Sequence, residues 1–207
     1  MGSDADELDE RHPARVMARE NRVFSGMVVR AQDHVRQARE LPDDELDPTL
    51  LDLLKDDLAF LSKVSLHYRR KEELLVPVLA DHGETSLPRR VQEDDDRVRT
   101  CLWMASSLLD GAEGRPSGSN LESAAEQLAD ACDAIDLVAE REDDGLIPLA
   151  LEVLGDDEWA LVARRSEEPA YVAGDGAPAL WTSPIERAEA AVRRAIDAGR
   201  LPGASGA

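Results

Sequence analysis

Four long stretches of this chain have apolar residues, mainly Leu, Val and Ala, at intervals of three and four residues. In the first stretch these include Val16, Val23, Met27 and Ala31. Such spacing lines up the apolar side chains along one side of an α-helix, which turns once every ~3.6 residues. The aromatic content of only 3% also suits helices better than a β-sandwich. We therefore expect an all-α protein.

Proline and aspartate mark where the first two helices begin. Pro13 suits the first turn of a helix that opens at His12 and reaches about Glu40, because the first N–H groups of a helix have no intrahelical acceptor. Asp47 is a favourable N-cap for a second helix, and Pro48 fits its first helical position. The sequence therefore predicts a break between Glu40 and Asp47.

Proline and glycine also set the later helix boundaries. Pro77 should kink the second helix before Gly83 ends it. A third helix begins near Pro88, and the Gly/Ser/Pro-rich residues 111–120 form a linker to the fourth. Asn120 should cap this fourth helix, which we expect to match the second in length, at about thirty residues.

The second and fourth helices also share a sequence pattern. Residues 71–77, Lys-Glu-Glu-Leu-Leu-Val-Pro, can be laid over residues 142–148, Glu-Asp-Asp-Gly-Leu-Ile-Pro. Acidic residues, two apolar residues and proline recur in the same order. The two helices therefore echo each other in sequence as well as in length.

Short connections between long helices favour antiparallel neighbours, so we predict an up-down-up-down four-helix bundle with short C-terminal helices. Residues 12–172 would form the bundle and a short fifth helix at 156–165. Residues 1–11 would be a flexible acidic N-terminus. Residues 173–207 would hold an irregular strap, a small helix that starts at a Ser183 capping box, and a flexible tail.

The charge pattern limits the partners of the chain. The net charge is −20, and lysine occurs only at positions 55, 63 and 71. Such an acidic surface repels phosphate backbones. No apolar run reaches the ~18 residues of a membrane helix, and the polar N-terminus does not resemble a signal peptide. We expect a cytoplasmic protein with no nucleic-acid or membrane partner, in which Cys101 and Cys132 are buried thiols.

Several ionisable side chains fall on the apolar sides of the first two helices. Glu20 lies between apolar residues of the first helix, and His12 lies on the same side near its start. His67 shares its direction with apolar residues of the second helix. Lys71 and Glu72 follow within the next turn, and Lys71 points more inward than Glu72.

Asp95 and Glu142 occupy the same kind of position on the third and fourth helices. Each has an apolar residue three or four places away on both sides. Burying an isolated carboxylate costs several kcal/mol unless it is paired or binds a cation. Three such acids and two imidazoles from four helices therefore suggest a metal-ligand cage. With the neighbouring Glu72 added, the candidate ligands are His12, Glu20, His67, Glu72, Asp95 and Glu142.

Structural roles explain such residues about as well. Arg15, Arg19 or Arg99 could neutralise an inward acid, and a lone histidine is usually structural. His34 lies too far along the first helix to join the cluster, and we expect it in the core or at an interface. His82 lies at the end of the second helix, where it should interact with the helix dipole.

The segment 67–77, His-Tyr-Arg-Arg-Lys-Glu-Glu-Leu-Leu-Val-Pro, with Asp-His-Gly at 81–83, resembles the second-helix motif of hemerythrin-like HHE cation-binding proteins. It is most similar to a subgroup often joined to PAS domains, whose first helix also has His-Pro and Glu-Asn, here at 12–13 and 20–21. Residues 146–152 and 157–159 resemble the last-helix signature of that subgroup. The resemblance spans about residues 12–172. It implies a non-haem di-iron centre, with manganese or zinc as alternative metals.

The chain departs from the family pattern at the expected ligands. The pattern has Glu four residues after the second-helix His, where this chain has Lys71, and Glu72 is one place later. The position of Asp95 is commonly His in relatives, and Val138 stands where a fourth-helix His would be expected. A carboxylate-rich site for iron or manganese is thus easier to build than a histidine-rich oxygen carrier. Loss of the metal during divergence is the alternative.

Three functions follow from these observations. The leading hypothesis is a metal-binding bundle that senses or binds oxygen, nitric oxide or peroxide, or handles iron, with a second copy or a signalling protein as its partner. The second is a metal-free helical scaffold or interaction module whose buried acids are balanced by arginine and Lys71. The third is a di-iron carboxylate oxidase or peroxidase, although the paired Glu-x-x-His motifs expected of such enzymes are absent from the sequence.

Overall fold

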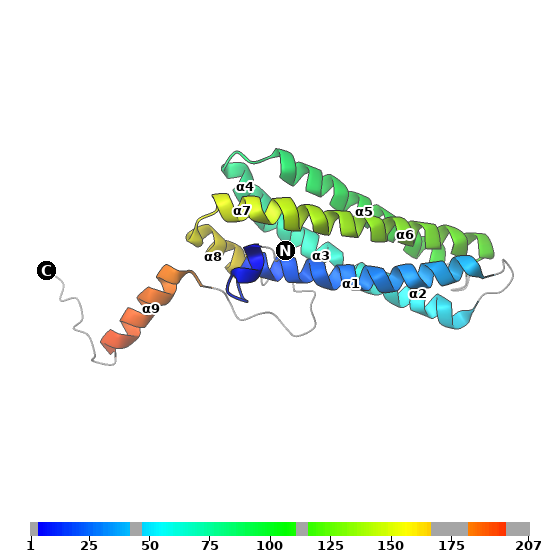
Figure 1. The fold of residues 1–207 in the computed structure, drawn as a ribbon, viewed down its shortest axis with the longest axis horizontal. Helices are drawn as coiled ribbons and strands as arrows, with labels where there is room; N and C mark the ends of the chain where they lie inside the picture. The colour runs from blue at the N-terminus through cyan, green and yellow to red at the C-terminus, as the bar shows by residue number, and fades with distance from the viewer. Residues whose placement is uncertain (1–3, 42–46, 111–115, 167–181, 198–207) are drawn as a thin grey trace.

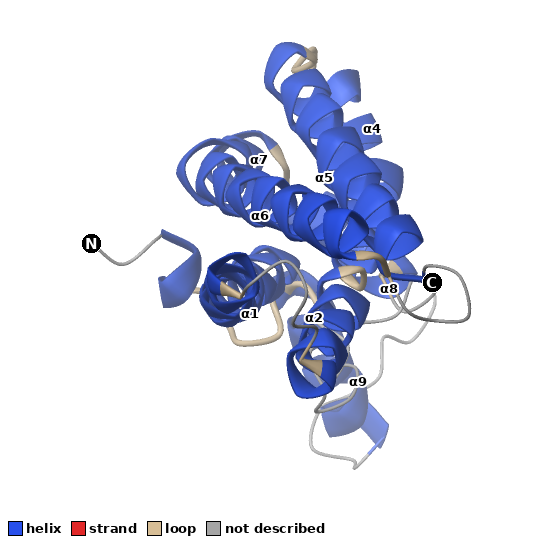
Figure 2. Cartoon of the chain, turned by 90° about the vertical axis from the view of Figure 1, so that its right-hand side faces the viewer, coloured by secondary structure: helices blue, strands red, loops and turns tan. Residues whose placement is uncertain are grey.

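The protein is described by a computed structural model that covers residues 4–41, 47–110, 116–166 and 182–197. Every regular element in these residues is helical, as predicted, and none of them forms a strand (Figure 2). Helix α6 (Gly118–Arg141) packs antiparallel to both α1 (Pro13–Glu40) and α5 (Ser86–Asp110) (Figure 1). The long helices thus lie side by side and share one core.

The first two helices begin where the sequence predicted. His12 is the N-cap of α1, and its Nδ1 accepts a hydrogen bond from the backbone N–H of Ala14 at 3.2 Å. Helix α2 (Pro48–Leu61) starts after Asp47, whose side chain accepts from the N–H of Thr49 at 2.8 Å. In both helices proline follows the cap, where its missing N–H costs no hydrogen bond.

The predicted second helix consists of several pieces. After α2, Ser62 and Lys63 form a turn, and α3 (Val64–Arg70) follows. The hydroxyl of Ser62 donates to the carbonyl of Leu58 at 2.7 Å, a local side-chain bond that competes with continuous helix. The chain continues through the π-helical turn η2 (Lys71–Leu75) and α4 (Val76–Asp81). It ends at Gly83 as predicted, where a φ of 86° suits glycine.

A second π-helical turn, η3 (Glu142–Leu146), interrupts the fourth stretch. The N–H of Val76 bonds to the carbonyl of Lys71 in η2, and the N–H of Ile147 bonds to that of Glu142 in η3. Each turn precedes a proline, at position 77 or 148, whose ring would clash with the carbonyl four residues earlier in a regular α-helix. The wider turn relieves that conflict. The proline effect expected at Pro77 therefore takes the form of a π-turn, repeated in the segment that echoes it.

The fourth stretch starts slightly earlier than predicted. Ser117, rather than Asn120, is the N-cap of α6, and its Oγ accepts from the N–H of Asn120 at 3.2 Å. After η3 come α7 (Ile147–Val153) and α8 (Asp156–Arg165), and α8 has the bounds that the sequence predicted. Of the predicted linker at 111–120, residues 111–115 lie outside the described part of the chain.

The two ends of the described chain differ in how well the sequence anticipated them. Residues 1–11 were expected to be flexible, but Asp4–Glu7 form a 3-10 turn, η1, and Ala5 is fully buried against the core. Helix α9 (Pro184–Asp197) begins at the predicted capping box, in which Ser183 and Glu186 exchange hydrogen bonds of 2.9 and 3.1 Å. The predicted strap at 174–181 and the tail beyond residue 197 lie outside the described residues.

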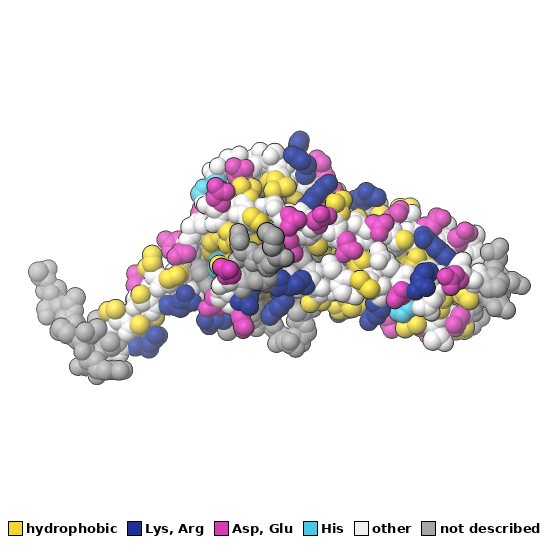
Figure 3. Space-filling model, in the orientation of Figure 1, with side chains coloured by type: hydrophobic (Ala, Val, Ile, Leu, Met, Phe, Trp, Pro, Cys, Tyr) yellow, Lys and Arg dark blue, Asp and Glu magenta, His cyan; other side chains and the backbone are white. Residues whose placement is uncertain are grey.

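The core is built from Leu, Val and Ala side chains, as the low aromatic content implied. Contacts link α1 with α2, α2 with α5, α5 with α6, and α6 with α1. Acidic and basic side chains are interspersed on the face seen in Figure 3. Both cysteines are buried and free. Among the described residues, no helix combines the length and the apolar character that a membrane crossing requires.

Candidate functional site

Four of the six predicted site residues meet inside the protein. Glu20 from α1, His67 from α3, Asp95 from α5 and Glu142 from η3 are each at most 1% exposed. They come from all four helical stretches, as the inward-facing positions in the sequence predicted. Their convergence produces a polar cluster in the middle of an apolar core.

His67 bridges two of these carboxylates. Its Nδ1 lies 2.8 Å from Oε2 of Glu20, and its Nε2 lies 2.8 Å from Oε2 of Glu142. Burial by itself would lower the pKa of His67, but the charges and hydrogen bonds of Glu142 and Glu20 outweigh it and raise that pKa to about 9. His67 is therefore a buried imidazolium that donates from both ring nitrogens.

Arg70 is the second cation paired with Glu20. Its guanidinium donates to Oε2 of Glu20 at 2.7 Å and to Oε1 at 3.3 Å, a bidentate pair. Burial would raise the pKa of Glu20, but the hydrogen bond and charge of His67, together with Arg70, lower it to about 2. Glu20 therefore stays ionised between two cations.

Lys71 joins the remaining two acids. Its Nζ donates to Oδ1 of Asp95 at 2.9 Å and to Oε1 of Glu142, and it lies 4.5 Å from the centre of the Tyr68 ring. Burial would raise the pKa of Glu142, but the charges of Lys71 and His67 lower it to about 2. Lys71 is itself only 1% exposed, so its ammonium group lies wholly inside the protein.

Asp95 is the least well satisfied member of the cluster. Its Oδ2 is buried and, within the described part of the protein, has no hydrogen-bond partner. Burial raises the pKa of Asp95 to about 7, against the attraction of Lys71 and with the repulsion of Glu142. The hydroxyl of Tyr68 is also buried without a hydrogen-bond partner among the described residues. Polar groups of this kind are rare in native cores.

These contacts form an alternating series of charges, which we call the ionic chain. Three cations and three acids take part, so the charges balance when all six are ionised. Each inner member has an oppositely charged neighbour on both sides, which offsets the cost of burial. In order along the series, the members are Arg70, Glu20, His67, Glu142, Lys71 and Asp95.

The other two predicted site residues lie outside the ionic chain. Glu72 is half-buried, and its two carboxylate oxygens accept from Arg99 at 2.8 and 2.9 Å. His12 caps α1 about 12 Å along the helix from Glu20. Its ring packs against Trp159 of α8 with a centroid distance of 4.8 Å. Burial lowers the pKa of His12 to about 4, so its ring is neutral and its Nδ1 can accept the hydrogen bond from Ala14.

Replacing His12 by Ala should lower the free energy of unfolding by about 2 kcal/mol, because the helix cap and the contact with Trp159 are both lost. Urea denaturation measures this change. His12→Asn, which retains a capping acceptor, should recover roughly half of the loss. His82→Ala serves as the control, since His82 pairs with Glu158 at the surface. Equal losses for His12→Ala and His82→Ala would contradict the structural role assigned to His12.

Sequence reasoning did not identify Arg70 as a member of the cluster, although it lies one turn after His67. It did place Lys71 inward. His34 is on α1 and faces α2, where its Nδ1 is 2.5 Å from Oδ2 of the buried Asp57, in agreement with the core or interface position predicted for it. Arg30 bonds to the same carboxylate at 2.8 Å.

The di-iron centre implied by the hemerythrin-like resemblance does not fit this arrangement. A histidine ligand needs an unprotonated ring nitrogen, whereas both nitrogens of His67 donate to carboxylates. The ammonium group of Lys71 takes the place between Asp95 and Glu142 that a cation would otherwise occupy. Within the described ranges, no group of three or more His, Cys, Asp or Glu side chains is arranged to hold a metal ion.

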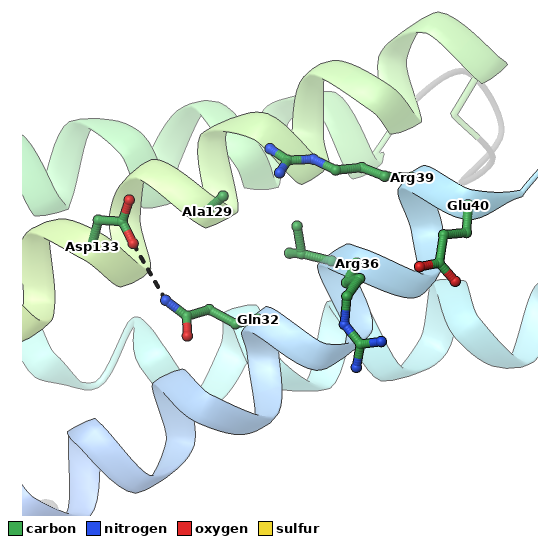
Figure 4. A pocket seen from close by; sticks show the side chains of 7 residues that line it. Gln32, Arg36, Arg39, Glu40, Ala129 and Asp133 are labelled. Atoms are coloured by element: carbon green, nitrogen blue, oxygen red, sulfur yellow. Dashed lines mark hydrogen bonds between the residues drawn. The ribbon is translucent and has the colours of Figure 1, made fainter.

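A surface hollow of about 430 Å³ lies between α1 and α6, away from the ionic chain (Figure 4). Gln32 of α1 donates to Asp133 of α6 across it at 3.3 Å. Gln32 follows Glu20 by twelve residues, which is about 18 Å along the helix. None of the residues that line the hollow belongs to the ionic chain.

Comparison with known proteins adds no further constraint on the site. No protein-family model matches the sequence, and no curated protein is significantly similar to it. The geometry of the ionic chain must therefore support any functional proposal.

Proposed function

We propose that this chain is a hemerythrin-like, up-down-up-down four-helix bundle that acts as a metal-free scaffold or interaction module. One observation carries the proposal: the ammonium group of Lys71 bonds to both Asp95 and Glu142 in the core. A lysine in this place supplies positive charge from within the chain. The acids then need no external cation.

The helix arrangement supports the fold part of the proposal. Contacts join the four stretches in a closed order, α1, α2, α5 and α6, with neighbours running antiparallel. The polar residues project into the space between these helices, where bundles usually hold their cofactors. The resemblance at residues 67–77 and 81–83, and at 146–152 and 157–159, points to the same family of folds.

The charge balance supports the metal-free part. Placing an iron ion among Glu20, Asp95 and Glu142 would require these acids to leave Arg70, His67 and Lys71. The released cations would remain buried with fewer oppositely charged partners, which costs several kcal/mol. The ionic chain would therefore have to be broken for any of the metal-dependent functions. These are sensing or binding of oxygen, nitric oxide or peroxide, iron handling, and di-iron oxidase or peroxidase chemistry.

Exposed apolar side chains support a role in binding another protein. Helix α9 presents Ile185 and Val192 to solvent, 58% and 50% exposed, at a spacing of two turns. Such a stripe is typical of a helix that binds in an apolar groove. A second copy of the chain or a signalling protein is the kind of partner we propose.

The metal-free proposal predicts that the protein purified without air from iron-supplemented cells contains iron, manganese and zinc well below one ion per chain. Its melting temperature should change by less than about 1 °C on addition of a chelator or of ferrous iron, since a ligand that binds the native state would raise it. Elemental analysis and thermal unfolding make these measurements.

A stoichiometric metal content would overturn the proposal, above all if exposure to air produced an oxo-bridge or peroxo absorption band. The variant Lys63→Met is a matched control for metal gained or lost during purification. It removes an exposed lysine that lies 5.1 Å from the Phe60 ring and leaves the ionic chain intact.

A further inference from the structure

We infer that Lys71 is the built-in cation of this bundle, and that removing its charge would open a site for one divalent cation between Asp95 and Glu142. The inference rests on the proposed function, because it takes the unaltered chain to be free of metal. Lys71 alone would then be the residue that keeps metal ions out of the core.

Two carboxylates from different helices converge on one point, the Nζ atom of Lys71. Asp95 on α5 and Glu142 on η3 each direct an oxygen at this atom. The second oxygen of Asp95 is fully buried and has no hydrogen-bond partner among the described residues. Removing the ammonium group therefore leaves two carboxylate oxygens, Oδ1 of Asp95 and Oε1 of Glu142, directed at one position. The second oxygen of Glu142 stays bonded to His67, and the second oxygen of Asp95 can turn toward an ion.

Oxygen-rich sites of this kind suit hard divalent cations such as Mn²⁺. Metal–oxygen bonds are about 2.1 Å long in such sites, against 2.9 Å from Asp95 to the nitrogen of Lys71. A modest inward shift of each carboxylate would therefore complete the coordination, with water filling the remaining positions.

The charge count favours a cation in the absence of Lys71. With Asp95 ionised, Arg70 and His67 would then face Glu20, Asp95 and Glu142, so two positive charges would oppose three negative ones. The nearby Arg99 is committed elsewhere, because it bonds to Glu72 and Asp96. Glu142 would keep His67 as its partner, whereas Asp95 would lose the cation that is hydrogen-bonded to it.

The test measures Mn²⁺ binding to the full chain, from the loss of the free-ion EPR signal during titration. The proteins are the unaltered chain, Lys71→Ala, Lys71→Met and the control Lys63→Met. Lys71→Ala leaves room for an ion and its water molecules, while Lys71→Met keeps the side-chain volume. We expect one ion per chain in Lys71→Ala, with at least about 100-fold tighter binding than in the control.

A rise in melting temperature with Mn²⁺ should accompany binding in Lys71→Ala. If a variant is unfolded without metal, recovery of its helical circular dichroism in Mn²⁺ supports the inference equally. Failure of both Lys71 variants to bind Mn²⁺ or to fold in it overturns the inference, even where the unaltered chain is metal-free. Metal in the unaltered chain instead overturns the proposed function, so the two failures are distinguishable.

Discussion

Lys71→Met should lower the free energy of unfolding by about 3–5 kcal/mol near neutral pH, in the absence of metal, because it removes one partner from a buried set of ion pairs. Asp95 is fully buried, and Lys71 is the cation bonded to it. Met fills a similar volume, so the loss reports charge rather than a cavity. Urea denaturation with a two-state fit measures it.

The exposed control Lys63→Met should cost less than about 1 kcal/mol. The double variant Lys71→Met/Asp95→Asn removes both the cation and the charge that it neutralises. It should therefore be more stable than Lys71→Met alone, by about 1–2 kcal/mol. A cost that is the same with Asp or Asn at position 95 would show that the ion pair is not the reason for the loss.

The helix pattern predicted most of the fold because it depends on local chemistry. The starts of α1 and α2 follow from a capping side chain and a proline that are adjacent in sequence. The two π-turns could not be predicted in the same way. Proline at 77 and 148 indicated a disturbance, but whether the chain kinks or inserts a residue depends on how it packs against neighbouring helices.

The sequence predicted those site residues whose position on the helix fixes the direction of the side chain. Glu20, Asp95 and Glu142 lie among apolar neighbours in sequence, and all three are buried. The direction of a long basic side chain is set less by sequence position, because it can reach either solvent or a buried acid. Arg70 was therefore missed until its partner, fifty residues away, could be placed beside it.

His12 and Glu72 show the opposite limit of sequence reasoning. His12 does lie on the inward side of α1, but its position at the helix start brings it against Trp159 of α8. Glu72 follows an inward-facing lysine by one residue, and this offset directs it to Arg99. A side chain that is predicted to face the core therefore need not reach the cluster of buried charges.

The pKa of His67 makes stability depend on pH on the alkaline side. This pKa is about 9 in the folded chain and 6.5 at its ordinary value, so the folded state binds a proton that the unfolded state has lost between these values. The stabilisation is complete below pH 6.5 and is lost as the pH rises through 9. We expect the free energy of unfolding to fall by up to roughly 3 kcal/mol across this window.

Thermal or urea unfolding from about pH 7 to 8.5 tests this dependence. Asp95, with a pKa of about 7, and His12, with an ordinary value of 6.5, titrate mainly at or below the lower limit. The upper limit stays below the ordinary value of 9.0 of the buried thiols Cys101 and Cys132, whose pKa values burial raises further. His67→Gln should be less stable than the unaltered chain at pH 7, and its stability should change little across the range. His82→Gln, which alters a partly exposed pair, should keep the full decline. A decline of equal size in His67→Gln would mean that another group titrates, and that His67 is not a buried imidazolium held between Glu20 and Glu142.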